Sequence, residues 1–389
     1  MALTETLATK QVVAVIVGVL VVGGGGAAAY AATGGELPFA SEDASAVDTV
    51  PAGVDYVVYL DPGVRDDRTT KDLVDGFVDI ARDQDADYEG PASYDALREN
   101  VSEQTDADVD IDELNHAVLY GRYPDVSGPA ADTGPDVDYV GVLVDSTWNE
   151  SRFVDLVANG TAYEQRAYEG YTVYVQQSGT DDGSAPAPTW IGVLGDGRYV
   201  LGTEQAVTDA LDVRADEADA FGGPLREQYD ATREGYLRFA VNVPEPNDVT
   251  PATQAVLTDN QFGAFRNLST VAGSYYTDGD AVGMELRLGT ASEDDATDLR
   301  AILRGTFALT EESMRTREME QLIDSATIER EGTTVVVTFQ RPVAEILTAV
   351  EAGVESWSEL SALSSGLSAG GTFGDAVDSY NETARSADG

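Results

Sequence analysis

An uncharged apolar stretch near the N-terminus constrains this chain more than any other feature. No residue is charged from Gln11 to Thr33, and Val12–Val22 is an almost unbroken aliphatic run. In a helix, about 21 residues span roughly 31 Å, which matches the hydrocarbon core of a membrane. A buried helix of a soluble domain is disfavoured because four successive glycines, 23–26, follow the aliphatic run. The sequence therefore predicts a transmembrane helix or signal segment at residues 11–33.

The charges that flank this segment indicate its orientation. Lys10 is the only positive charge nearby, and the first charged residues after the segment, beginning with Glu36, are all acidic. Because positively charged flanks stay inside, we expect a cytoplasmic N-terminus at residues 1–10 and a large domain outside the cell membrane. A retained single-pass signal anchor is favoured. The alternative is a secreted protein, cleaved near 29–31.

The rest of the chain is strongly acidic. The formal net charge is −47, and none of it lies in residues 1–32, where Glu5 and Lys10 cancel. In dilute buffer this charge would repel itself, whereas in molar salt the Debye length falls to roughly 3 Å. The chain has two lysines, Lys10 and Lys71, and its remaining basic residues are arginines. This composition resembles that of haloarchaeal proteins, and we interpret the charge as an adaptation to a halophilic environment.

Composition also excludes several classes of function. Tyrosine and phenylalanine number 18 and 10, so the acidity does not indicate a disordered chain. Phosphate recognition needs a basic face, which argues against a nucleic-acid partner. Cysteine is absent, which excludes thiolate metal sites, iron–sulfur clusters, disulfides and thiol nucleophiles. We expect no cofactor.

Asparagines provide a second sign of export. The chain has nine, and five of them begin an Asn-x-Ser/Thr sequence, where roughly one was expected by chance. This excess predicts a glycoprotein. The glycosylation candidates are Asn100, Asn149, Asn159, Asn267 and Asn381.

Hydrophobic periodicity and turn residues predict a mixed α+β domain after the membrane segment. Hairpins are expected to turn at Glu169-Gly170, Asp196-Gly197, Asp278-Gly279 and Glu331-Gly332. Further strands are expected at 54–60, 117–123, 139–144 and 237–243. Helices are expected at 69–83, 93–103, 150–158, 204–213 and 343–358, and a helical zone is expected from 293 to 326. Ser292 and Asp295 resemble a capping box at the start of that zone.

These elements suggest two modules of antiparallel hairpins and packed helices. Residues 137–177 run strand, helix, hairpin, and residues 280–340 repeat that order, which indicates a duplication unless common elements coincide. The expected organisation is a cytoplasmic end (1–10), the membrane segment (11–33), an acidic stalk (34–51), a first α/β module (52–235), a second (236–362) and a disordered Gly/Ser-rich tail (363–389).

Candidate chemical sites are weak. The alternating acids of 83–89 lack the glycine and glutamate that an EF-hand calcium loop requires, and a Gly-x-Ser-x-Gly match at 366–370 lies in the tail. His116 is the only histidine, so we expect it on the surface or at a helix end. Trp148 and Trp190 fit core packing better than a ligand groove. The sequence therefore predicts no catalytic and no metal residues.

Four local patterns resemble an uncharacterised family of membrane-anchored extracytoplasmic proteins, a domain of unknown function. These patterns are Pro51–Leu60, the segment from Ile111 and Asp112 through Leu114–Tyr120, the Tyr168–Tyr174 hairpin and Gly195–Gly202. In the second, the leucine falls one place earlier than in the family pattern. The resemblance covers about residues 50–350 and implies a fold, and it brings no site residues with it.

Together these observations predict a non-enzymatic surface or envelope protein that acts as an interaction module. Its expected partners are the membrane, through residues 11–33, and an envelope protein or the cell-surface layer. A lipid- or small-solute-binding protein is the first alternative, and it would need a sizeable apolar pocket. A carboxylate-dependent hydrolase is the second, and it would need carboxylates converging in a cleft.

Overall fold

The computed structural model describes residues 46–84, 91–96, 113–123, 139–158, 161–177, 189–243, 267–313 and 316–353. Within those ranges no helix is long and apolar enough to span a membrane. The expected cytoplasmic end, the membrane segment at 11–33, most of the stalk and the tail lie outside the described residues. Their assignments therefore stay predictions.

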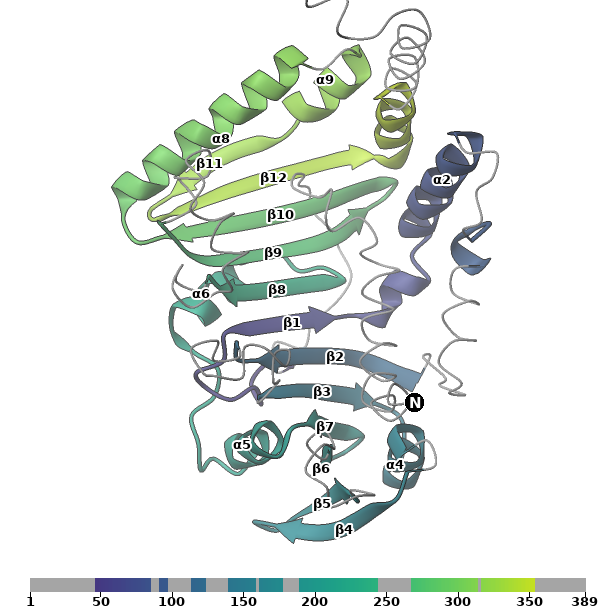
Figure 1. Cartoon of the computed structure of the whole chain (residues 1–389), viewed down its shortest axis with the longest axis vertical. Coiled ribbons are helices and arrows are strands. Elements are labelled where there is room, and N and C mark those ends of the chain that lie inside the picture. The colour runs from purple at the N-terminus through teal and green to yellow at the C-terminus, as the bar shows by residue number, and fades with distance from the viewer. Residues whose placement is uncertain are drawn as a thin grey trace, which may run out of the picture.

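The described residues form an α+β fold built on one antiparallel sheet of twelve strands (Figure 1). Its order is β11-β12-β10-β9-β8-β1-β2-β3-β7-β6-β5-β4. The strands are β1 (Tyr56–Leu60), β2 (Leu114–Gly121), β3 (Val140–Ser146), β4 (Tyr163–Tyr168), β5 (Tyr171–Gln176), β6 (Trp190–Gly195), β7 (Arg198–Gly202), β8 (Leu237–Asn242), β9 (Leu268–Asp278), β10 (Ala281–Thr290), β11 (Thr327–Glu331) and β12 (Thr334–Pro342).

Helices cover both faces of this sheet. A 3₁₀ turn, η1 (Pro62–Arg65), follows β1. A last helix, at 343–353, follows β12 directly and is called the 343–353 helix below. The other helices are α2 (Arg68–Gln84), α4 (Glu150–Ala158), α5 (Glu204–Arg214), α6 (Gly223–Ala231), α8 (Glu293–Ser313) and α9 (Arg317–Asp324).

Alternation along the strands sends successive side chains to opposite faces. Tyr59 packs in the cluster formed with α5 and α6, and its neighbour Leu60 packs in the cluster formed with α4. Leu237 lies directly opposite Leu60 in β8, so it shares that face, where it joins the cluster formed with α2 and the 343–353 helix. The sheet is thus a central layer between a larger helical layer and a smaller one.

Hairpin turns follow the sequence closely. Glu169 and Gly170 both have positive φ (45° and 89°), as do Asp196 and Gly197 (55° and 78°). Two such residues make the tight turn whose twist matches antiparallel strands, and glycine adopts this conformation without strain. These two predicted hairpins are confirmed, as are those that turn at Asp278-Gly279 and Glu331-Gly332 and the helix at 150–158.

Both halves of the chain build the sheet in the same order. In the first half β1, β2 and β3 are neighbours, and in the second half β8, β9 and β10 are neighbours. β3 is followed by α4 and the β4–β5 hairpin, and β10 is followed by α8, α9 and the β11–β12 hairpin. In the first half, however, β6 and β7 lie between the hairpin and β3 in the sheet. The halves meet where β1 pairs with β8, so one sheet runs through both of the expected modules.

Three local expectations differ from the structure. The segment before β8, where no helix is among those expected from the sequence, contains α6, which Pro224 starts and whose Leu225 and Tyr229 are buried one turn apart. The helical zone from 293 is two helices, α8 and α9, while its capping box is present: Asp295 N donates to Ser292 Oγ at 3.2 Å. Val47 and Val50, at the end of the expected stalk, are buried in the core.

Candidate functional site: an acidic cleft beside the last helix

An open cleft of about 700 Å³ lies between α9 and the 343–353 helix. Its volume falls in the range of small-ligand sites, roughly 300–1,000 Å³. It is lined by Glu318, Gln321, Leu322, Asp324, Arg341, Ala344, Glu345 and Thr348.

Helical periodicity of the 343–353 helix decides which side chains reach the cleft. Val343, Ile346 and Ala349 recur every three residues and are buried. The positions between them, Ala344, Glu345 and Thr348, therefore turn away from the core and line the cleft.

A close approach between two helices fixes the position of the 343–353 helix. Gly76 of α2 faces Leu347, and a Cβ on Gly76 would lie 2.1 Å from Leu347 Cδ1. Any larger residue at position 76 would force the Leu347 side chain to move. Phe77 and Leu322 pack in the same cluster, which ties α2 and α9 to the wall of the cleft.

The cleft carries a net negative charge. Three carboxylates face one guanidinium, which leaves a net charge of −2. Arg341 Nη1 lies 3.7 Å from Glu345 Oε2, with side chains 36% and 58% exposed. Such an exposed pair contributes little to stability, so the charges remain available to a positively charged group of a ligand.

The described residues offer no metal centre. Among residues 46–353, with the gaps given above, no group of three or more His, Asp or Glu side chains is placed to hold an ion. The Gly-x-Ser-x-Gly match lies outside the described residues, as does most of the 83–89 series.

Two of the five glycosylation candidates can be placed, and both are exposed. Asn149 caps α4: its Oδ1 accepts hydrogen bonds from Ser151 Oγ at 2.8 Å and Arg152 N at 3.0 Å. The side-chain amide of Asn267 donates to the carboxylate of Asp295 at the start of α8. Asn100, Asn159 and Asn381 lie outside the described residues.

Aromatic candidates belong to the core and the hairpins, as the sequence favoured. Trp148 and Trp190 are 6% and 8% exposed. Tyr174 donates to Glu150 Oε1 at 2.6 Å, and this hydrogen bond, with burial, raises the pKa of Tyr174 to about 12. His116, expected at a surface or helix end, instead lies half-buried within β2, its ring 5.7 Å from that of Tyr59.

Sequence reasoning missed a buried cation. Arg238 in β8 is 5% exposed, and burial lowers its pKa to about 10. Its Nη2 donates to the carbonyl of Tyr229 at 2.7 Å, its Nε donates to Thr232 Oγ1 at 3.1 Å, and its guanidinium lies 4.3 Å from the Tyr229 ring. These contacts bind the end of α6 to the sheet, which gives Arg238 a structural role. A single arginine within a strand-like sequence does not indicate that its side chain will be buried.

The cleft was missed as well. Its lining residues come from α9, the end of β12 and the 343–353 helix, which are adjacent only after the sheet has formed. Asp and Glu number 70 in this chain, so no local pattern distinguished the three that line the cleft.

Comparison with known proteins assigns no family. No protein-family model matches the chain, and no curated protein does. Solved structures with some likeness include three crystal forms of TP0453. Form I has a TM-score of 0.38 at 10% identity, covering 80% of this chain and 99% of that one. Forms III and IV have TM-scores of 0.36 and 0.37, both at 11% identity, covering 79% and 78% of this chain and 97% and 96% of the other. Similarity of this degree gives neither a family nor a function to the chain.

Proposed function

We propose that this chain is a membrane-anchored extracytoplasmic protein of a high-salt organism that works by binding another envelope component. The uncharged segment at 11–33 supports the anchor, and the net charge of −47 supports the solvent. The resemblance of Pro51–Leu60 and three further segments to membrane-anchored extracytoplasmic proteins also supports the anchor. Outside the membrane, the two expected modules form the binding body.

The observation that carries binding is the acidic cleft. It is accessible, lies between two helices that the core holds in place, and is lined by three carboxylates and by the aliphatic side chains of Leu322 and Ala344. A positively charged group on an apolar stem, such as a lysine or arginine side chain of a partner, fits this chemistry. The partner we propose is therefore an envelope protein that offers a basic segment.

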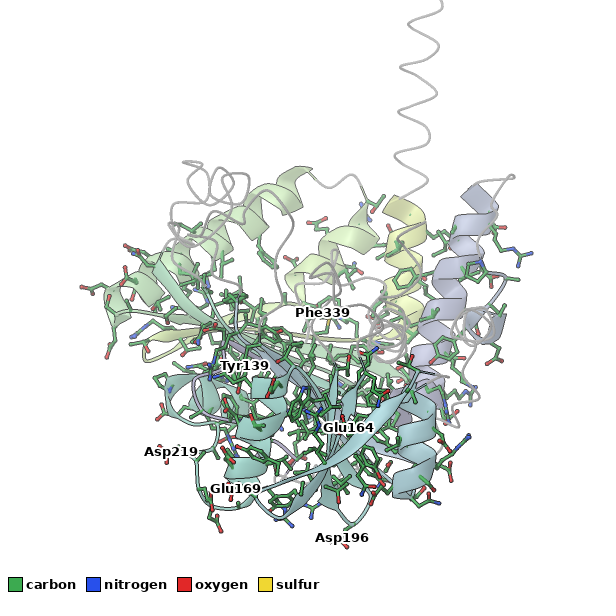
Figure 2. The ribbon with its side chains drawn as sticks, turned by 60° about the horizontal axis from the view of Figure 1, so that its bottom comes forward. Tyr139, Glu164, Glu169, Asp196, Asp219 and Phe339 are labelled. Carbon is green, nitrogen blue, oxygen red and sulfur yellow. The ribbon has the colours of Figure 1, made fainter. Side chains whose placement is uncertain are left out.

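Exposed carboxylates elsewhere support the high-salt part of the proposal. Figure 2 shows Glu169, Asp196 and Asp219 at the periphery, where they point away from the ribbon, and Glu164 on β4. Glu169 and Asp196 occupy hairpin turns and are exposed. Carboxylates placed at the tips of turns meet solvent and do not converge on one another.

Binding agrees with the cleft better than hydrolysis does. An acid catalyst needs a carboxyl group adapted to hold its proton, usually by burial. Glu318, Asp324 and Glu345 are all exposed, and Glu345 is paired with Arg341. A lipid-binding protein needs an enclosed apolar pocket, whereas most residues of this cleft are polar. The volume of the cleft favours a small cationic solute as a second candidate ligand.

Photo-crosslinking in intact cells tests the proposed site. A photoreactive phenylalanine analogue replaces Gln321 in the cleft, and in a matched control it replaces Gln205, which is exposed on α5. We expect one discrete adduct from position 321 that Glu318→Gln and Glu345→Gln together abolish. Equal adducts from both positions, or none from position 321, would reject the cleft.

Protease accessibility tests the proposed location separately. Trypsin added to intact cells should cleave after the exposed Arg214 at the end of α5. Protection in intact cells with cleavage after lysis would place the domain inside.

A further inference from the structure

The two edge strands of the sheet differ in whether other parts of the described chain cover them. At one edge, α8 lies along β11 (Figure 1). The carbonyl of Ile328 in β11 accepts hydrogen bonds from Arg300 Nε at 3.3 Å and from Arg304 Nη2 at 3.2 Å, both on α8. This edge carbonyl is therefore satisfied by the chain's own side chains, which discourages pairing with another strand.

The other edge, β4, is open as far as the described residues go. Glu164, Gln165, Arg166 and Ala167 are all exposed, and β5 is the only strand partner of β4 among the described residues. No helix of the described chain lies along its outer side in the manner of α8, as Figure 1 shows.

Hydrogen-bond alternation identifies the backbone groups that face outward. Gln177 N donates to Ala162 O at 2.9 Å, so the carbonyl of residue 162 points toward the β5 side. Even-numbered residues of β4 thus bond with β5, and Tyr163, Gln165 and Ala167 direct their N–H and C=O groups away from it. No group of the described residues satisfies these outward groups in the way that Arg300 and Arg304 satisfy Ile328.

We propose that β4 pairs with β4 of a second copy of this chain, antiparallel and centred on Gln165. In this register Gln165 lies opposite Gln165, and Tyr163 lies opposite Ala167. The outward-facing residues therefore meet one another, as a ladder requires, and form six backbone hydrogen bonds about a two-fold axis. The result is one continuous sheet across two copies.

Side-chain charge fits the same register. Glu164 of one copy lies opposite Arg166 of the other, and the two-fold axis creates this pair twice. Within a single chain Arg166 Nη2 already lies 2.8 Å from Glu164 Oε2, so both side chains occupy one face of the strand. Opposite charges directly across an antiparallel pair are favourable, and like charges are not.

The zero net charge of β4 explains why two copies of so acidic a chain can associate at this edge. β4 contains one acid and one base, so its net charge is zero, in contrast with the chain's −47. In molar salt the repulsion between the remaining surfaces is screened beyond roughly 3 Å. A strand of this length spans about 20 Å, which gives a small contact that specific cross-linking can capture.

Cysteine cross-linking tests the register directly. The chain has no cysteine, so Gln165→Cys in the full-length protein introduces a single thiol. Opposed Cα atoms in an antiparallel ladder are about 5.5 Å apart, within reach of a disulfide. Mild oxidation of the purified protein in molar salt and detergent should give a reducible covalent dimer.

The matched control is Glu169→Cys, which is equally exposed and four residues farther along the same hairpin. In the proposed register the two residues 169 would be about 26 Å apart, so this variant should stay monomeric. Equal cross-linking of both variants would indicate random collision and overturn the proposal. A folded Gln165→Cys variant that gives no dimer would also overturn it.

Charge reversal in the Gln165→Cys background provides a second measurement. Glu164→Arg alone places arginine opposite arginine at two points and should lower the dimer yield roughly five- to tenfold. Arg166→Glu alone should do the same, and the double reversal should restore the yield. A double reversal no better than either single change would contradict the proposed pairing.

Discussion

Phe153 of α4 stacks on Tyr199 of β7, with ring centroids 4.1 Å apart and planes inclined by 7°. Both side chains are about 2% exposed, and the Tyr199 hydroxyl donates to the carbonyl of Trp148 at 2.8 Å. This stack holds α4 on β7, and Tyr163 and Tyr174 of the β4–β5 hairpin pack against the same cluster.

Replacing Phe153 with alanine should therefore be strongly destabilising. Removing a buried phenylalanine leaves a cavity that costs about 3–5 kcal/mol. Urea unfolding in molar salt measures the loss. Asp155→Ala, at an exposed position of the same helix, should change the free energy of unfolding by less than about 0.5 kcal/mol. A Phe153→Ala loss as small as that of the control would mean that α4 is not packed as described.

Alkaline pH should unfold the protein through its tyrosines. Burial raises the pKa of Tyr163 to about 12, and the hydrogen bond to Glu150, with burial, raises that of Tyr174 to about 12. An unfolded tyrosine titrates near 10, so the unfolded state loses its protons first. The stabilising contribution of these groups is complete below pH 10 and is lost as the pH rises toward 12.

Absorbance at 295 nm follows this titration. Tyr174→Phe should reduce the fall in stability between pH 10 and pH 12, because one shifted group has been removed. Stability that rises through this interval would contradict the assignment and would point to Arg238, whose lowered pKa acts in the opposite direction.

Asn149 should carry a glycan if the domain is exported. Its side chain is exposed at the start of α4. The corresponding amide of Asn267 donates to Asp295, so modification there must break a contact at the start of α8. Intact-mass measurement of the protein from its own cells should show a mass that Asn149→Gln lowers by one glycan. An unchanged mass would remove Asn149 from the candidates.

Stability should depend steeply on salt at neutral pH. The exposed carboxylates repel one another at low ionic strength, so transfer from molar salt to about 0.1 M should lower the unfolding temperature. Near pH 4, close to the sequence isoelectric point of 4.1, much of this charge is neutralised and the salt dependence should weaken. Calorimetry at both pH values measures the two slopes. Equal slopes at the two pH values would show that the salt dependence of stability does not arise from the net charge.

Local patterns predicted most of the secondary structure. Glu-Gly and Asp-Gly turns located the β4–β5 and β6–β7 hairpins because glycine adopts positive φ without strain, so a tight turn is indicated by two adjacent residues. Ser292 and Asp295 located the start of α8 for a similar reason. The helix α6 was missed because its surroundings are acidic, although Pro224, Leu225 and Tyr229 carried its signal.

The sequence by itself determined the uncharged segment at 11–33, the acidic exterior and the positions of the hairpin turns, because each follows from adjacent residues. Only the tertiary structure decided that β1 and β8 join both halves into one sheet, that Arg238 is buried, and that α9 meets the 343–353 helix at a cleft. It also decided that Arg300 and Arg304 bind the β11 edge, while β4 has a strand partner on one side only among the described residues. These features join residues far apart in the chain, and the pairing that brings them together is selected by the packing of the whole sheet.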